Sequence, residues 1–181
     1  MTLLTPELEK YIGMESEIEI ACDSVERGAV RRYSQAIMDD DPLYHDEAAA
    51  KKSKYGATVA PPLLPMYIFR RDFGTPDPIR ENAANPDFDG IVGATVQGLP
   101  PLPLEGFALL NAGTDVEFFR YAEHGDRITA KNRYDGIVEK ESRSGPMLLV
   151  FIETEYRNDK GELLMRVKKT HIRRPPKART Q

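Results

Sequence analysis

The segment 61–69 constrains the fold most, because it is apolar on nearly every side. It opens with Pro61 and Pro62, and proline suits the first turn of a helix, where a missing N–H costs little. The large apolar side chains that follow are Leu63, Leu64, Met66, Tyr67, Ile68 and Phe69. A helix that is apolar all round has to be buried. The segment therefore predicts a central helix that other elements cover on most sides.

The last third of the chain predicts the cover. Polar and apolar residues alternate over 115–120 and 126–131, an apolar run fills 147–152, and another strand starts at 163–167. The sequence Asn158-Asp159-Lys160-Gly161 is typical of a hairpin turn. Earlier patterns predict a strand over 15–21 and an amphipathic helix over 24–38. We therefore expect an α+β fold in which a curved antiparallel sheet wraps around a buried helix.

The length of 181 residues suits one domain, which we expect over residues 1–174. Residues 74–105 are rich in proline and glycine and contain an apolar island, Ile91–Val96. A loop of this length is usually functional or mobile, so two interpretations stay open: a substrate-covering loop or a disordered insertion. The basic tail 175–181 is expected to be disordered.

Composition narrows the class of function. The net charge of −4 argues against a nucleic-acid partner. No apolar run reaches the 18 residues of a membrane span, and the first residues do not begin a signal peptide. The single Cys22 excludes an intramolecular disulfide and suits a reducing compartment, so we expect a cytoplasmic protein. The three histidines are too scattered to predict a metal site. His124 precedes a turn, and we expect it to be structural.

The residues most typical of a functional site lie in two stretches, Asp39-Asp40-Asp41-Pro42-Leu43-Tyr44-His45-Asp46 and Tyr55-Gly56-Ala57-Thr58-Val59-Ala60-Pro61-Pro62. Together they hold four acids, a histidine, two tyrosines and a Pro-Pro step. Their order resembles the hot-dog fold, and more narrowly the MaoC-like (R)-specific enoyl-CoA hydratase and dehydratase family. The resemblance extends from about Ile12 to Arg174 and includes the run from Phe118 to Asp126.

Catalytic members of that family carry a loop of the form Gly-Asp-x-Asn-Pro-Leu-His-x-Asp, followed by Ala-His-Gly at the start of the buried helix. In them the Asp and His activate water for addition to an α,β-unsaturated thioester, and the Gly N–H helps to hold the thioester carbonyl. In this chain Asp39 stands at the catalytic Asp, but Met38 replaces the Gly before it and Tyr44 replaces the catalytic His. Tyrosine titrates near pH ~10, which makes it a poor general base at neutral pH.

The second motif also differs from the pattern of the catalytic members. Ala60 matches the family, whereas Pro61 replaces His and Pro62 replaces Gly. Proline has no N–H and cannot donate to a carbonyl oxygen. The same departures resemble the non-catalytic half of two-part hydratases, namely the FAS1-like dehydratase N-terminal domain and the substrate-holding subunit of (3R)-hydroxyacyl dehydratases.

The resemblance implies a subunit that shapes an acyl-thioester pocket, pairs with a catalytic MaoC-like partner and needs no cofactor, with acyl-CoA or acyl carrier protein delivering the substrate. Two alternatives stay open: a stand-alone homodimeric hydratase that uses Asp39 and His45, and a non-enzymatic acyl-thioester-binding protein. In the first alternative the loop is re-registered by one residue; otherwise His45 is a solvated loop residue. The residues that the resemblance places near a substrate are Tyr44, Tyr55, Ala60, Pro62 and Met66.

Overall fold

The computed structural model describes residues 2–69, 74–87, 98–143 and 145–176. Five strands form one antiparallel sheet in the order β1-β3-β4-β5-β2. Their bounds are β1 Glu19–Ser24, β2 Ala108–Phe118, β3 Arg127–Ser142, β4 Gly145–Arg157 and β5 Leu163–Arg174. The helices are short, at α1 Pro6–Glu9, α2 Arg27–Ile37, α3 Glu47–Lys52, α4 Leu64–Tyr67 and α5 Pro78–Asn82, with a 3₁₀ turn η1 at Pro42–Tyr44.

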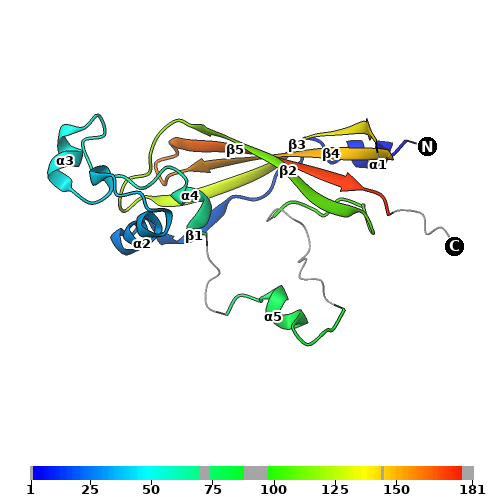
Figure 1. Ribbon diagram of the computed structural model, residues 1–181, viewed down its shortest axis with the longest axis horizontal. Coiled ribbons are helices and arrows are strands. Elements are labelled where there is room, and N and C mark those ends of the chain that lie inside the picture. The colour runs from blue at the N-terminus through cyan, green and yellow to red at the C-terminus, as the bar shows by residue number, and fades with distance from the viewer. Residues whose placement is uncertain (1, 70–73, 88–97, 144, 177–181) are drawn as a thin grey trace.

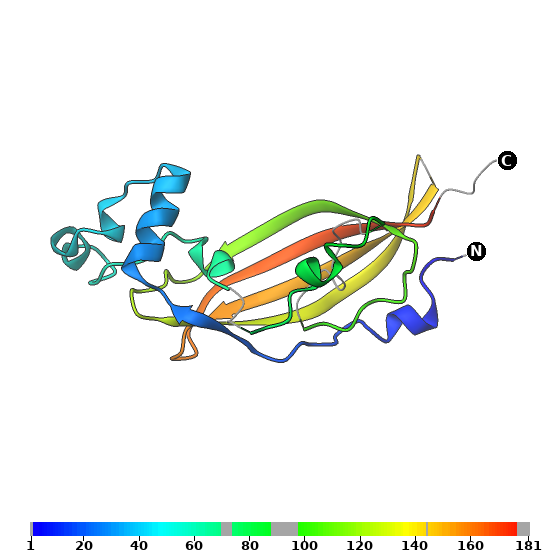
Figure 2. The same ribbon diagram turned by 90° about the horizontal axis from the view of Figure 1, so that it is seen from below.

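The helices divide between the two ends of the long sheet. Helices α2, α3 and α4 gather at one end, which we call the site end (Figure 1). Helix α1 lies at the other end beside the β3–β4 hairpin, which we call the hairpin end (Figures 1 and 2). Helix α5 stands off the middle of the sheet, on the same side as α2 and α4 (Figure 1). We call that side of the sheet its inner face and the opposite side its outer face.

Alternation along the strands builds the core on the inner face. In β4, Leu148, Val150 and Ile152 are at most 2% exposed, while the residues between them are half-buried on the outer face. Two clusters cover this face. At the site end Val30 of α2, Leu64 of α4 and the acid-rich loop pack on β1, β3 and β5. At the hairpin end the packing comes from α1 and residues 99–107.

The predicted elements are present, with shifted bounds. The first strand begins at Glu19 rather than at residue 15, and the amphipathic helix begins at Arg27 rather than at residue 24, because β1 continues to Ser24. The predicted central helix over 61–69 is a single turn, Leu64–Tyr67. Its prolines explain the difference, since each removes an N–H donor and three of them fall within residues 61–65. Leu64, Pro65 and Ile68 are buried, while Tyr67 is half exposed.

The segment 74–105 is partly described. It contains helix α5, and its far end places Leu99 and Leu104 in the core at the hairpin end. The apolar island Ile91–Val96 lies outside the described residues, and so does the tail from residue 177. No helix within the described ranges is long and apolar enough to cross a membrane.

Candidate functional site

The end of α2 sets the direction of the acid-rich loop. Met38 adopts a left-handed conformation with φ of 56°, and the amides of Met38 and Asp39 donate to the carbonyls of Gln35 and Ser34. This reverse turn closes the helix and sends the chain toward η1. Glycine is the usual residue there because a Cβ is strained at positive φ. Met38 is 91% exposed, so no packing of its side chain offsets the strain.

Two of the four acids of the loop cap helices. The Asp41 carboxylate accepts the Leu43 N–H at 2.9 Å, at the start of η1. The Asp46 carboxylate accepts the N–H groups of Ala48 and Ala49 at 2.8 and 3.1 Å, at the start of α3. These two backbone bonds lower the pKa of Asp46. Asp41 and Asp46 are therefore engaged in holding the loop.

Asp39 is bonded to the residue that stands where the resembling family has histidine. The Tyr44 hydroxyl donates to the Asp39 carboxylate at 3.1 Å. Tyr44 is only 6% exposed and packs in the core at the site end. Burial, the hydrogen bond to Asp39 and the charges of Asp39 and Asp41 all raise the pKa of Tyr44. At neutral pH the phenol is therefore a donor and cannot accept a proton from water.

A cavity of about 610 Å³ opens between α2 and this loop. Asp39, Tyr44 and His45 all line it, so three of the residues singled out from the sequence share one wall. The full lining is Arg27, Val30, Arg31, Ser34, Gln35, Met38, Asp39, Asp40, Tyr44, His45 and His124. The volume suits a small-molecule ligand or part of a larger one.

His124 also lines the cavity, although the sequence pattern assigned it a structural role. It reaches the site because Val59 pairs with Glu123, next to it, in an isolated antiparallel bridge. Both ring nitrogens are buried, and they face the backbone of Tyr44 and Val59. Burial, and then the charge of Arg27, lower the pKa of His124, so its neutral form is favoured. About eighty positions separate it from the loop, and no local motif reveals the pairing.

The remaining predicted substrate residues lie outside the lining of this cavity. Tyr55 stacks on Tyr121 with ring centroids 5.1 Å apart, in a separate surface hollow. Ala60 is fully buried, and its N–H donates to the Ala122 carbonyl at 2.8 Å. Pro62 is half-buried, and Met66 packs against the core at the site end. A ligand role for these residues stays a prediction.

The site contains no evident metal ligand set. Within the described ranges, no three His, Cys, Asp or Glu side chains are gathered so as to hold a metal ion. The arrangement itself presents three groups that can take part in chemistry. These are a carboxylate bonded to a phenol, an exposed imidazole at His45 and a buried neutral imidazole at His124.

A family model for the FAS1-like dehydratase domain region matches residues 10–167. Among curated proteins, a UPF0336 protein from Thermobifida fusca (strain YX) is 36% identical over 58 residues. That stretch is 32% of this chain and only 38% of the relative's length.

Solved structures resemble the whole fold. The ChsH1-ChsH2 complex from Mycobacterium tuberculosis matches with a TM-score of 0.68 and 16% identity, over 96% of this chain and 90% of that one. A MaoC-like dehydratase from Rhodospirillum rubrum matches with a TM-score of 0.56 and 21% identity, over 91% and 94% of the two chains. The HadBC (3R-hydroxyacyl-ACP dehydratase) complex from M. tuberculosis gives 0.55 and 20%, over 90% and 96%. These likenesses confirm the predicted hot-dog fold.

Proposed function

The chain belongs to the FAS1-like dehydratase domain family, and from that premise we propose that it is the non-catalytic subunit of a MaoC-like enoyl-CoA hydratase/(3R)-hydroxyacyl dehydratase. In this role it shapes the acyl-thioester pocket while a second hot-dog subunit supplies the catalytic residues. The observation that carries the proposal is the hydrogen bond from Tyr44 to Asp39. In this bond the Asp39 carboxylate accepts from a phenol, which stands at the position where catalytic members have histidine.

The chemistry of hydration supports this division of labour. Addition of water to an enoyl thioester needs a group that takes a proton from water and a donor that stabilises the thioester oxygen. The raised pKa of Tyr44 disqualifies it as the base. Pro62 has no N–H for the oxygen, and loss of one such donor can cost about 10²–10³ in rate. The cavity of about 610 Å³ beside the loop fits a subunit that holds an acyl group and leaves the reaction to a partner.

The exposed edge of the sheet supports the proposal that the chain has a partner subunit. β2 is an edge strand, and all of its residues except Leu109 and Val116 are exposed. A long exposed edge is a template for pairing with another strand. Two of the structural relatives are complexes of hot-dog subunits. We propose that this edge pairs with the catalytic subunit, so that the two sheets join.

The segment 74–105 is the part of the chain that we propose as a selectivity element for bulky acyl groups. It follows the central helix directly, and its apolar island exceeds what a solvated loop needs. Deleting residues 80–97 tests this. We expect activity of the complex on bulky enoyl-CoAs to fall more than activity on crotonyl-CoA. Equal loss on both, or no loss, would contradict it.

A second candidate function is a stand-alone homodimeric hydratase in which His45 is the base. The observation that favours it is that His45 and Asp39 line the same cavity. His45 is exposed, whereas Asp39 is half-buried. The side chain that donates to the Asp39 carboxylate in the described structure is Tyr44 and not His45.

One assay separates the two candidates. The pure chain is tested with crotonyl-CoA and with bulkier enoyl-CoAs, alone and with a MaoC-like partner that carries the intact motifs and is encoded by a neighbouring reading frame. We expect background turnover alone and turnover in the pair. Robust turnover by the chain alone, abolished by Asp39→Asn or His45→Ala, would overturn the subunit proposal in favour of the homodimer.

A further inference from the structure

The outer face of the sheet carries an apolar row that crosses four strands. Val138 of β3 pairs with Leu149 of β4, Leu149 with Ile172 of β5, and Ile172 with Leu110 of β2. Because paired residues point to the same side of a sheet, the four side chains form one line perpendicular to the strands. We call it the outer row. Val138 is 40% and Leu110 47% exposed, and the two central residues are half-buried.

The neighbouring register position adds to the apolar area, and its side chains project little above the sheet. Phe151 pairs with Gly136 on one side and Thr170 on the other, and Thr170 pairs with Gly113. A Cβ at Gly136 would stand 3.5 Å from the Phe151 ring, so the ring lies close over the glycine. Small residues around one flat ring leave a surface that a second sheet can approach closely.

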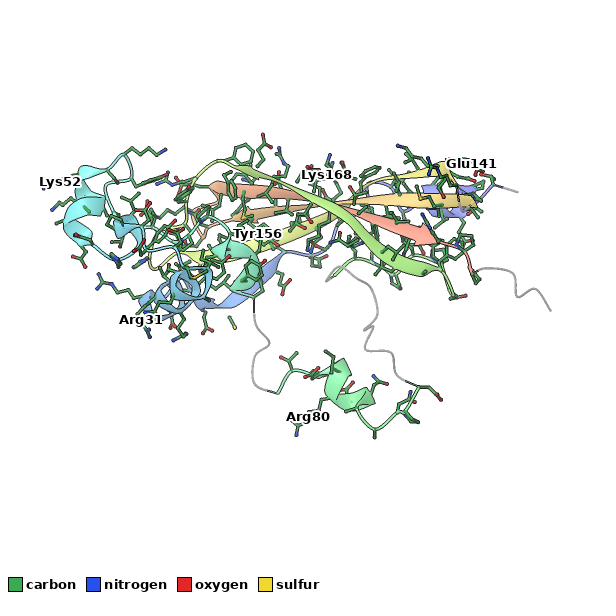
Figure 3. All side chains as sticks on the ribbon, viewed as in Figure 1. Arg31, Lys52, Arg80, Glu141, Tyr156 and Lys168 are labelled. Carbon is green, nitrogen blue, oxygen red and sulfur yellow. The ribbon has the colours of Figure 1, made fainter. Side chains whose placement is uncertain are left out.

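The other half of the same face is of a different kind. There the side chains pair among themselves: Arg133 with Glu153 at 3.0 Å, Lys168 with Asp135 at 2.6 Å, and Arg166 with Glu155 at 3.0 Å. Most of the charges in this half therefore compensate one another. Figure 3 shows Lys168 on this face, opposite Tyr156 and α4. No helix of the described part of the chain lies over this face of the sheet (Figures 1 and 3).

We propose that the outer row is an interface at which two copies of this chain pack back to back, sheet against sheet. The arrangement of charges on both sides of the row identifies a second copy as the occupant. One side is basic, with Lys140 and Arg174 at the next outward-facing register position. The other side, beyond Phe151, has three carboxylates against two cations: Arg133, Asp135, Glu153, Lys168 and Asp115.

This polarity also fixes the symmetry of the dimer. A two-fold axis that runs along the outer row reverses the strand direction, and it sets the basic side of one copy over the acid-rich side of the other. An axis along the strands would set each side over itself and oppose like charges. Complementary sides favour the first axis. It sets Val138 opposite Val138 of the second copy, whereas the other axis sets Val138 opposite Leu110. This interface differs from the β2 edge and is independent of the proposed activity.

The test is the mass of the full chain by light scattering, over a range of concentrations. We expect Leu149→Glu to halve the mass of the assembly by weakening this association at least about tenfold, since the charge would be buried at the centre of an interface. Val138→Lys should do the same, which guards against a folding defect in one variant, and circular dichroism checks the fold of both. Thr129→Glu is the matched control, because it adds a charge to the outer face of β3 outside the row.

Crosslinking tests the symmetry. In a Cys22→Ser background, Val138→Cys should join two copies through a short bismaleimide, and Thr129→Cys should not. A wild-type chain that is monomeric at every concentration would overturn the proposal. So would an unchanged mass for both charged variants, or loss of binding to a catalytic partner while self-association persists. Activity plays no part in these readouts, so their failure is distinguishable from failure of the proposed function.

Discussion

The two ends of the sheet are held together by different kinds of contact. At the hairpin end the inner face is filled by apolar packing, with Leu148 fully buried against α1 and residues 99–107. The site end has a half-buried carboxylate, a histidine whose ring nitrogens are buried, and a left-handed Met38. Departures from local rules tend to gather where a chain serves something besides stability. The comparison indicates that both ends have a buried apolar core and that substitutions for function accumulate at the site end.

The largest effect that we expect concerns the site end. Tyr44→His together with Pro62→Gly restores two of the family residues that the chain lacks. The new imidazole would lie near Asp39 and titrate near pH ~6.5, and the new amide could donate to a thioester oxygen. We expect hydratase activity on crotonyl-CoA to rise about 10²-fold or more over the wild-type background. The measurement is the rate of hydration by the purified chain.

The control for this gain is a third substitution, Asp39→Asn, which should return the activity to background. Each single change alone should give less than the pair, because base and donor act in the same step. Equal activity of wild type and double variant would show that the lost dyad does not limit this chain. That result would remove the chemical distinction between the two ends.

The second prediction concerns stability. Leu148→Ala should lower the free energy of unfolding by about 2–5 kcal/mol, because it removes a fully buried side chain and leaves a cavity. Tyr44→Phe keeps the ring and removes only the hydrogen bond to Asp39, so we expect a loss of about 0.5–1.5 kcal/mol. Urea unfolding at one protein concentration measures both. A greater loss for Tyr44→Phe would show that the bond to Asp39 stabilises the fold more than the burial of Leu148 does.

Sequence patterns predicted where strands occur because alternation is a local property, but β2 begins at Ala108 and β3 continues to Ser142, beyond the predicted 115–120 and 126–131. The strands from 115 to 167 and the hairpin turn at Asn158 follow directly from residue period and turn chemistry. The central helix was predicted too long, because its apolar content was weighed above its prolines. Asp39, Tyr44 and His45 were found through one continuous motif. His124 was missed as a lining residue since only tertiary pairing brings it to the loop. The outer row likewise needs the register of four strands, which alternation alone does not give.

The third prediction tests the strain at the site end. Met38→Gly should raise the free energy of unfolding by about 0.5–1 kcal/mol, because glycine adopts the left-handed conformation without a Cβ penalty. The matched control is Ile37→Gly, one residue earlier and inside α2, which should lower it by about 1 kcal/mol. Thermal or urea unfolding distinguishes them. A loss in both variants would mean that the Met38 side chain contributes packing that its exposure does not reveal.

The smallest effect that we expect is a pH dependence shared by the two ends. Burial lowers the pKa of His124 at the site end and of His171, which pairs with Val150 on the inner face at the hairpin end. In the unfolded chain both titrate near pH ~6.5, so just below that pH the unfolded state binds more protons than the folded state. Stability should therefore be unaffected by these groups above pH ~7 and fall as the pH drops through ~6.5.

Single substitutions show how much each histidine contributes to this dependence of stability on pH. His124→Asn and His171→Asn should each reduce the loss of stability between pH ~7 and ~5.5, a window above the range in which carboxylates titrate. Chemical unfolding at several pH values within that window measures it. We expect the His124 variant to retain the dependence that His171 supplies, and the reverse for the other variant, because the two groups lie at different ends of the sheet and should act additively. A wild-type slope that survives in the His124 variant would show that His124 is protonated as easily in the folded chain as in the unfolded one. The buried imidazole would then have to gain a partner or meet water in the cavity, and the site end would be more open than its burial indicates.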